Sequence, residues 1–199
     1  MFDPPGQSFK VKTIDGDGHC LYSGVGEGLA LLGFTKPAVP QLRGRTGEWL
    51  EQHWNGVEVI DFGGGIECNA TVRQQVCLHE EGVGNEIGDI SGEEYVKRFV
   101  EEGYGGLVVQ AVLAKILGIK ICVYLAKRNK ATNALTRTEG GEVCLIRLAT
   151  FGGRIEEEEE RRTEVHLLYD TAQHPSGHYD LLIPVNGFFG LFSCLSILA

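Results

Sequence analysis

One cysteine, Cys20, stands directly after a turn rich in aspartate and glycine, within the stretch DGDGHCLYSG at residues 15 to 24. Near the other end of the chain, His178 and Asp180 belong to the apolar run HYDLLIP. A cysteine nucleophile needs a base within hydrogen-bond reach and a third group that orients this base. Residues two apart on a strand share one face, so Asp180 is placed to orient the His178 imidazole. Cys20 and His178 are therefore the strongest candidate for a nucleophile and its base.

The residues around Cys20 also favour acyl-transfer chemistry. Apolar residues after Cys20 recur at spacings of three and four and predict a helix over residues 21 to 32. The unpaired N–H groups and the positive dipole end at its start favour a thiolate and are able to hold an oxyanion. Gly16 and Gly18 let the backbone adopt positive φ and approach a substrate closely.

The elements that must position these groups predict an α+β domain, with helices first and strands mostly later. Strands are expected at residues 8 to 14, 118 to 126, 142 to 149, 163 to 170 and 178 to 184. Further helices are expected at residues 40 to 53, 91 to 103, where Ser91 and Glu94 have capping-box spacing, and 107 to 118. The Gly-rich residues 61 to 90 are interpreted as a surface excursion or a poorly formed helical segment.

Composition narrows the class of protein. The 199 residues are 43% hydrophobic, which predicts one globular domain, and the formal net charge of −9 argues against a nucleic-acid partner. A cationic peptide or a basic protein surface suits this charge better. The six cysteines show no zinc-ligand spacing, and Cys122 and Cys144 lie in apolar runs where a thiol behaves as a small core residue. The N-terminus shows no signal peptide, so we expect a reduced, cytoplasmic protein.

Three segments together resemble a known family. DGHCLY is similar to the Asp-Gly-Asn-Cys-(Leu/Phe)-(Tyr/Phe) signature of the OTU (ovarian tumour) cysteine proteases, and His178-Tyr179-Asp180 resembles their closing histidine motif. Residues 93 to 124 look like the middle segment of that family, in which a Gly-Gly pair opens a helix that leads into a core strand. The resemblance spans residues 8 to 185. It implies a papain-like OTU domain over residues 1 to 185, with a small central β-sheet flanked by helices, followed by an apolar tail at 186 to 199.

The resemblance also implies an activity: a deubiquitinase that hydrolyses the isopeptide bond after the C-terminal Gly-Gly of ubiquitin, polyubiquitin or ubiquitin-like modifiers. Cys20 would be the nucleophile, His178 the general base, Asp17 the motif aspartate that shapes the loop around the oxyanion, and Asp180 the favoured orienting group. Oxyanion and substrate contacts are expected from Gly16, Gly18, His19, Gly105 and Gly106. No metal and no organic cofactor is implied. The sequence departs from the family at His19, where Asn is usual, and at Ser23-Gly24, where Arg-Ala or similar is typical.

Alternatives to these interpretations remain open. Cys20 would be an inert core residue were it not for its neighbours, and His174 is a weaker rival for the role of base. The chain would also fit an inactive OTU-like module that only binds ubiquitin, or a pathogen-type protease acting on other modifiers or a polyprotein. The acidic run 156 to 160 is interpreted as a solvated loop, or as an attraction for the Arg-bearing ubiquitin tail. The tail 186 to 199 is too short to span a bilayer and packs on the domain, contacts a partner or associates with a membrane.

Overall fold

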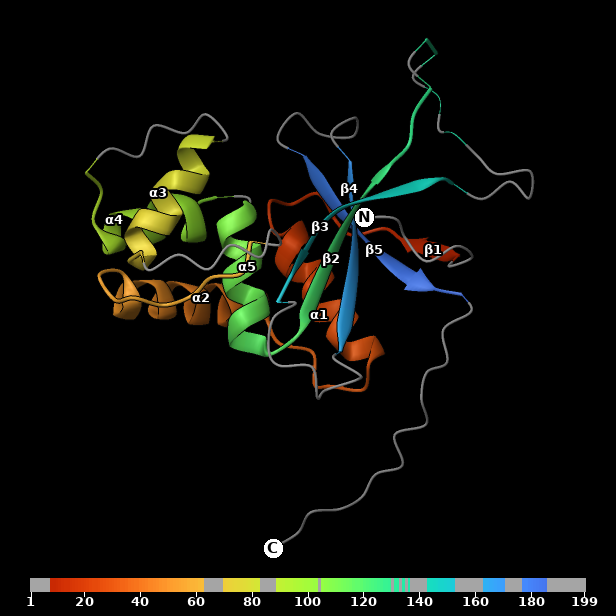
Figure 1. Cartoon of the computed structure of the whole chain (residues 1–199). Coiled ribbons are helices and arrows are strands. Elements are labelled where there is room, and N and C mark those ends of the chain that lie inside the picture. Colours follow the sequence, from red (N-terminus) through yellow and green to blue (C-terminus); the bar gives the residue numbers. More distant parts are fainter. Residues whose placement is uncertain are drawn as a thin grey trace, which may run out of the picture.

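The computed structural model describes ten stretches of the chain, and a mixed α+β domain is built from them (Figure 1). The described residues are 8–62, 70–82, 89–103, 105–129, 131–132, 134, 136, 143–152, 163–170 and 177–185. The acidic run 156 to 160, His174 and the tail 186 to 199 lie outside them. Within the described part, no helix is both long and apolar enough to cross a membrane.

A five-stranded sheet in the order β1-β5-β4-β2-β3 forms the centre of the domain. Its strands are β1 (Phe9–Lys12), β2 (Lys120–Ala126), β3 (Leu145–Phe151), β4 (Glu164–Asp170) and β5 (His178–Pro184). Strands β2 and β4 pair in parallel, whereas the other neighbours are antiparallel. The expected strands are therefore present, with ends shifted by a few residues.

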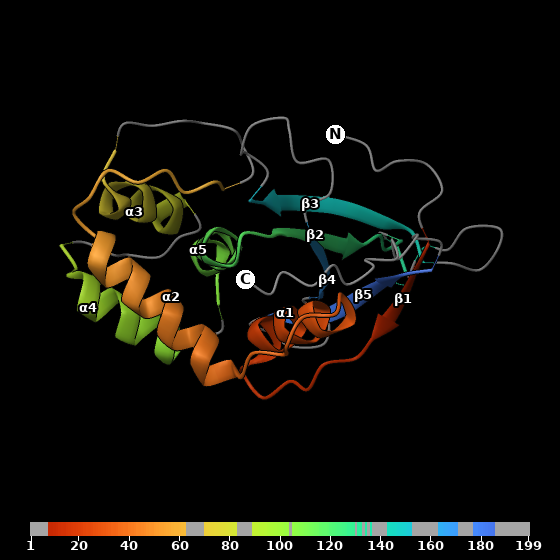
Figure 2. The same ribbon diagram turned by 90° about the horizontal axis from the view of Figure 1, so that it is seen from below.

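The helices gather on one face of the sheet and at one of its ends (Figure 2). They are α1 (Cys20–Leu31), α2 (Val39–His53), α3 (Val72–Gly82), α4 (Gly92–Tyr95), a π-helical turn η1 (Val96–Glu101) and α5 (Leu107–Leu117). Helix α1 packs on β4 and β5, and α5 lies between the sheet and the group formed by α2, α3 and α4.

The strand alternation divides the buried side chains between two cores. The larger core lies between the sheet and the helices, and its sheet residues are Ile121, Val123, Phe151, Val165, Leu167, Tyr179 and Leu181. A smaller cluster occupies the other face of the sheet and comprises Cys122, Tyr124, Leu168 and Leu182. His178 and Asp180 follow the same alternation as Leu182, whereas Tyr179 faces the helices.

Close packing accounts for the glycines of α1, which lower its intrinsic helix stability. A Cβ on Gly28 would lie 2.7 Å from a Val165 methyl group, and one on Gly24 would lie 3.0 Å from Leu167. Real Cβ atoms do not make contacts as short as the first of these. The glycines therefore let α1 approach β4 closely, and tertiary packing stabilises the helix.

The interpretation of residues 61 to 90 as irregular or poorly formed is wrong for residues 72 to 82, which form the regular helix α3. Val72 and Val76, one helical turn apart, are fully buried and attach α3 to the core. The Gln75 side chain donates to the Glu58 and Ala70 carbonyls and accepts from the Ile60 N–H. Packing and these side-chain bonds to backbone outweigh the local glycine content, which is all that the sequence interpretation had used.

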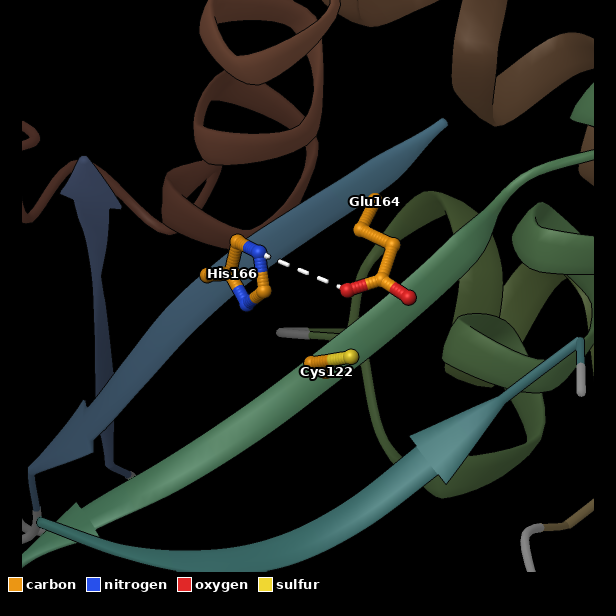
Figure 3. A group of neighbouring side chains, drawn as sticks. All are labelled: Cys122, Glu164 and His166. Carbon is orange, nitrogen blue, oxygen red and sulfur yellow. Dashed lines mark ion pairs between the residues drawn. The ribbon is translucent and has the colours of Figure 1, made fainter. Parts of the chain in front are cut away.

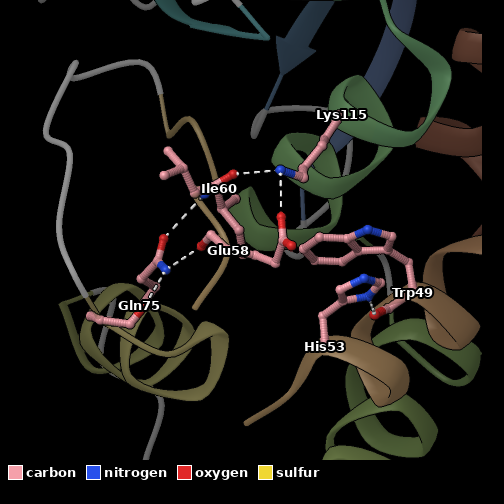
Figure 4. A network of polar contacts seen from close by, with 8 residues as sticks. Trp49, His53, Glu58, Ile60, Gln75 and Lys115 are labelled. Carbon is pink, nitrogen blue, oxygen red and sulfur yellow. Dashed lines mark hydrogen bonds and ion pairs between the residues drawn. The ribbon is translucent and has the colours of Figure 1, made fainter. Parts of the chain in front are cut away.

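Figure 4 shows how the segment before α3 is attached to its neighbours. Lys115 of α5 donates to the Val59 carbonyl at 2.9 Å and forms an ion pair with Glu58 at 3.1 Å. The Trp49 ring of α2 stacks on His53, with ring centroids 4.6 Å apart. Lys115 Nζ also lies 5.6 Å from the centroid of the Trp49 ring, and Gln75 of α3 binds the Glu58 carbonyl. Together these contacts join α2, α3 and α5 into one helical layer beside the sheet.

The predicted cap of the helix at residue 91 is present. The Ser91 hydroxyl accepts from the Glu94 N–H at 3.1 Å. After Tyr95 the helix widens into the π turn η1, closed by a bond from the Glu102 N–H to the Lys97 carbonyl. Helix termini and π turns leave carbonyls without a partner inside the helix, and these need other donors.

Candidate active site

Cys20 is the first residue of α1, and its side chain is buried. The first helical bond runs from the Ser23 N–H to the His19 carbonyl at 2.9 Å. The N–H groups of Cys20, Leu21 and Tyr22 therefore have no partner inside the helix. Aligned amides of this kind, with the helix dipole, stabilise negative charge close to the Cys20 thiol.

His178 and Asp180 lie together at the start of β5, and both are buried. His178 Nε2 is 3.1 Å from Asp180 Oδ1, and the Ile14 N–H donates to the same oxygen at 2.9 Å. A Cβ built on Gly16 would lie 3.8 Å from His178 Nδ1, so this nitrogen faces the turn that leads to Cys20. Asp180 thus occupies one nitrogen of the ring and leaves the other directed at the turn.

The structure does not join Cys20 directly to His178. Among the described residues, no hydrogen bond connects the Cys20 sulfur with either ring nitrogen. Catalytic hydrogen bonds are often long in enzymes without substrate and tighten when substrate binds. The arrangement is compatible with Cys20 as nucleophile and His178 as base, and this assignment stays a prediction.

Asp17 acts on the backbone of the turn rather than on His178. Its Oδ1 accepts from the His19 N–H at 2.9 Å, a local Asx-type bond that shapes the turn before Cys20. Gly18 has a φ of +84°, which a glycine adopts without strain. Gly16 is not among the described glycines with positive φ, so the expectation of such a backbone holds at Gly18 and is wrong at Gly16.

Arg43 of α2 holds this turn from the other side, a contact that the sequence interpretation missed. One terminal nitrogen lies 3.0 Å from the Gly18 carbonyl and 3.0 Å from His19 Nδ1. This nitrogen can only donate, so His19 Nδ1 is the acceptor and the ring is in the tautomer protonated at Nε2. The side chain at the unusual position 19 therefore accepts a bond from an arginine.

The other terminal nitrogen of Arg43 binds the end of η1. It donates to the carbonyls of Val100, Glu101 and Gly103, the last at 3.1 Å. The guanidinium also lies 4.4 Å from the centroid of the Tyr22 ring. Burial raises the pKa of Tyr22 to about 12, although the Arg43 charge acts in the opposite direction. Arg43 thus links the turn before Cys20, the start of α1 and the π turn.

The glycine pair at 105 and 106 lies between α1 and α5. Gly105 has a φ of +81°, and a Cβ there would lie 2.4 Å from the Leu21 Cδ2 atom. Gly106 is the extended N-cap residue of α5. Gly105 therefore packs against the residue that follows Cys20, and a substrate contact at either glycine stays a prediction.

A cavity of about 310 Å³ lies between α3, α5 and the sheet, and Gly106, Gln110 and Tyr179 contribute to its lining. Gln110 donates from Nε2 to the Tyr179 hydroxyl at 2.6 Å. Its Oε1 is buried and has no hydrogen-bond partner among the described residues. Burial raises the pKa of Tyr179, with smaller contributions from Tyr169 and Cys20, whereas the hydrogen bond from Gln110 lowers it.

A second thiol and imidazole lie together on the sheet face that α1 does not cover. Cys122 of β2 and His166 of β4 are cross-strand neighbours, and Glu164 is beside them (Figure 3). Burial raises the pKa of the Cys122 thiol, and Glu164 raises it further. Cys122 also lies inside a strand, away from any helix N-terminus. These features disfavour a thiolate, so Cys122 is a weaker candidate nucleophile than Cys20.

Comparison with solved structures identifies the fold as that of OTU domains. The OTU protease domain of Qalyub virus is 16% identical, with a TM-score of 0.51 over 89% of this chain and 85% of that one. The Hazara virus OTU bound to ubiquitin is 18% identical, with a TM-score of 0.50 over 90% and 84%. An OTU deubiquitinase from Wolbachia pipientis bound to ubiquitin is 10% identical, with a TM-score of 0.50 over 89% and 96%.

Comparisons based on sequence found no match. No protein-family model matches the chain. No curated protein matches it either. The expected papain-like OTU fold, with its small central sheet, is therefore confirmed by the three-dimensional arrangement alone.

Proposed function

We propose that this protein is a cysteine protease of the OTU type that hydrolyses the isopeptide bond after the C-terminal Gly-Gly of ubiquitin or a ubiquitin-like modifier. The observation that carries the proposal is the placement of His178. Asp180 holds its Nε2 at 3.1 Å, while its Nδ1 faces the turn that ends at Cys20. The OTU fold, and the ubiquitin bound to the Hazara virus and Wolbachia domains, support ubiquitin or polyubiquitin as the partner.

In the proposed mechanism, His178 takes the proton of the Cys20 thiol and the thiolate attacks the carbonyl carbon of the terminal glycine. The N–H groups at the start of α1 hold the oxyanion. The protonated His178 then gives its proton to the leaving amine, and a thioester remains on Cys20. A water that is deprotonated by His178 attacks the thioester, which releases the glycine carboxylate and regenerates the thiol.

The cavity lined by Gly106, Gln110 and Tyr179 supports the proposal that the enzyme binds an extended substrate tail. Glycine residues have no side chains, so a substrate tail that ends in Gly-Gly fits a narrow cavity of this kind. The reducing, cytoplasmic setting that the sequence predicts is part of this proposal.

The experiment is a reaction with ubiquitin that carries a C-terminal electrophile, read as a mass shift. We expect one adduct, lost in Cys20→Ala and retained in Cys122→Ala. The second variant is the matched control, because Cys122 lies near another histidine, His166. An adduct that survives Cys20→Ala, or that Cys122→Ala removes, contradicts the assignment.

A second candidate function is a module that binds ubiquitin without cleaving it. The buried Cys20 and the lack of a hydrogen bond from it to His178 within the described residues favour this candidate. It predicts that the wild-type protein binds ubiquitin in calorimetry, forms no adduct with the electrophile and leaves polyubiquitin chains intact.

A further inference from the structure

Three potential metal ligands from two strands lie together on the sheet face that α1 does not cover (Figure 3). They are the Cys122 sulfur, a carboxylate oxygen of Glu164 and a ring nitrogen of His166, all within 4.8 Å of one another. Parallel pairing of β2 and β4 sets Cys122 opposite His166. Cys122 is 42 positions from Glu164 and 44 from His166, so no short spacing motif of the sequence reveals the cluster.

The separation between His166 and Glu164 suits two ligands of a common ion better than it suits a direct bond. His166 Nε2 lies 3.7 Å from Glu164 Oε2, too far for a hydrogen bond. A tetrahedral zinc ion with ordinary Zn–N and Zn–O bonds of about 2.0 to 2.2 Å holds two such ligands roughly 3.3 to 3.6 Å apart. The present gap therefore needs to close by only a few tenths of an ångström around a zinc ion.

The surroundings orient two of the ligands. His166 Nδ1 lies 3.3 Å from the Tyr124 hydroxyl, which also accepts from Arg147. A histidine that ligates a metal through one nitrogen uses the other in such a hydrogen bond, which fixes its ring. The Thr150 hydroxyl is 3.8 Å from the Cys122 sulfur and donates to it.

Burial and access also fit a metal site. Cys122 and His166 are almost wholly buried, with 1% and 5% of their surfaces exposed. The Glu164 side chain is 38% exposed and provides a route from solvent, and its other oxygen, Oε1, is 3.4 Å from Lys120. The positive charge of Lys120 weakens the binding of a cation at this site. The same ion pair keeps Oε1 turned away from His166, which leaves Oε2 on the His166 side.

We propose that Cys122, Glu164 and His166 form a zinc site that fastens β4 to β2. One thiolate, one imidazole and one carboxylate are ligands that zinc accepts, and a water would complete the tetrahedron at the open side beside Glu164. Calcium and magnesium are disfavoured, because they require several oxygen ligands. Binding displaces the Cys122 proton to solvent, and no oxidation or reduction takes place.

The test uses the full chain with Cys20→Ala as background, so that the proposed nucleophile contributes no ligand. Zinc added at increasing concentrations is expected to bind one ion per chain and to raise the melting temperature. Cobalt is expected to give a thiolate-to-cobalt absorption band. Cys122→Ala should abolish the band and Glu164→Gln, near the surface, should weaken zinc binding at least tenfold.

Two further variants sharpen the result. Cys144→Ala removes a thiol outside the cluster and should leave zinc binding unchanged, while Lys120→Gln should tighten it, because a neighbouring positive charge is lost. The proposal is overturned if the Cys20→Ala protein binds no zinc, if the band survives Cys122→Ala, or if Glu164→Gln binds as tightly as its parent. None of these outcomes depends on protease activity.

Discussion

Replacing Asp180 by asparagine or by alanine separates two roles that this carboxylate combines. A single oxygen, Oδ1, accepts from the Ile14 N–H and lies within bonding distance of His178 Nε2. Asparagine keeps an oxygen acceptor at this position and loses the charge, whereas alanine loses both bonds. The comparison asks whether His178 needs an acceptor that orients it or a negative charge.

The Ile14 N–H decides how the asparagine amide is oriented. If the amide rotated, its NH₂ group would meet the Ile14 N–H, and leaving that buried donor unsatisfied costs about 1 to 3 kcal/mol. The oxygen therefore stays in place with a preference of roughly 5- to 150-fold. Asp180→Asn should then keep the His178 tautomer and lose only charge stabilisation, about 1.4 kcal/mol or tenfold in kcat/KM.

Asp180→Ala leaves the Ile14 N–H unsatisfied and the His178 ring without its acceptor. We expect kcat/KM to fall by about 10²- to 10³-fold, within the range that positioned acid–base groups contribute. The free energy of unfolding should fall by about 1 to 3 kcal/mol. The assay is hydrolysis of a fluorogenic amide of ubiquitin, with urea unfolding measured in parallel.

Asp170→Asn is the matched control for Asp180. This carboxylate lies across from His178 on β4, and it binds Arg128 at 2.9 Å. We expect kcat/KM to change less than about threefold, because the Asp170 carboxylate is paired with Arg128 rather than with His178. Activity of Asp180→Ala within threefold of wild type would refute the orienting role, and equal losses in the asparagine and alanine variants would refute the argument from Ile14.

Two further predictions concern the support of the turn before Cys20. Arg43→Ala removes every contact of the guanidinium and should lower the free energy of unfolding by about 2 to 4 kcal/mol and kcat/KM more than tenfold. Arg45→Ala loses one exposed bond and should change stability by less than about 1 kcal/mol; equal urea midpoints for the two variants would contradict the role of Arg43. Gly105→Ala combines left-handed strain with a clash against Leu21 and should cost about 2 to 5 kcal/mol in urea unfolding. Gly118→Ala has the strain without the clash and should cost about 1 to 2 kcal/mol, so equal losses would show that packing at Gly105 is unimportant.

Features with a local cause could be predicted from the sequence. The helix over residues 107 to 117 follows from its apolar pattern, and it ends at Gly118 with a φ of +64°. The Ser91 cap was visible because its partner is only three residues away. The pairing geometry of His178 with Asp180 follows in the same way from the period of a strand.

Features that depend on distant partners could not be predicted. The glycine content of residues 61 to 90 predicts a surface excursion or a poorly formed helical segment. The regular helix α3 forms there because Val72 and Val76 are buried against elements far along the chain. The bond from the Ile14 N–H to Asp180 joins positions 166 residues apart. The ligand cluster on β2 and β4 exists because the two strands pair in parallel, and pairing is a property of the fold.

Arg43 was missed for a further reason, which also bears on position 19. Most of its acceptors are backbone carbonyls, and a carbonyl is present in every residue type, so no pattern of side chains marks them. Within the described part of the chain, the one side chain that it hydrogen-bonds is the His19 ring, through a nitrogen acting as acceptor. An asparagine carbonyl is also an acceptor. The arginine therefore requires an acceptor at position 19 rather than one residue type, and a histidine there is compatible with the turn that leads to Cys20.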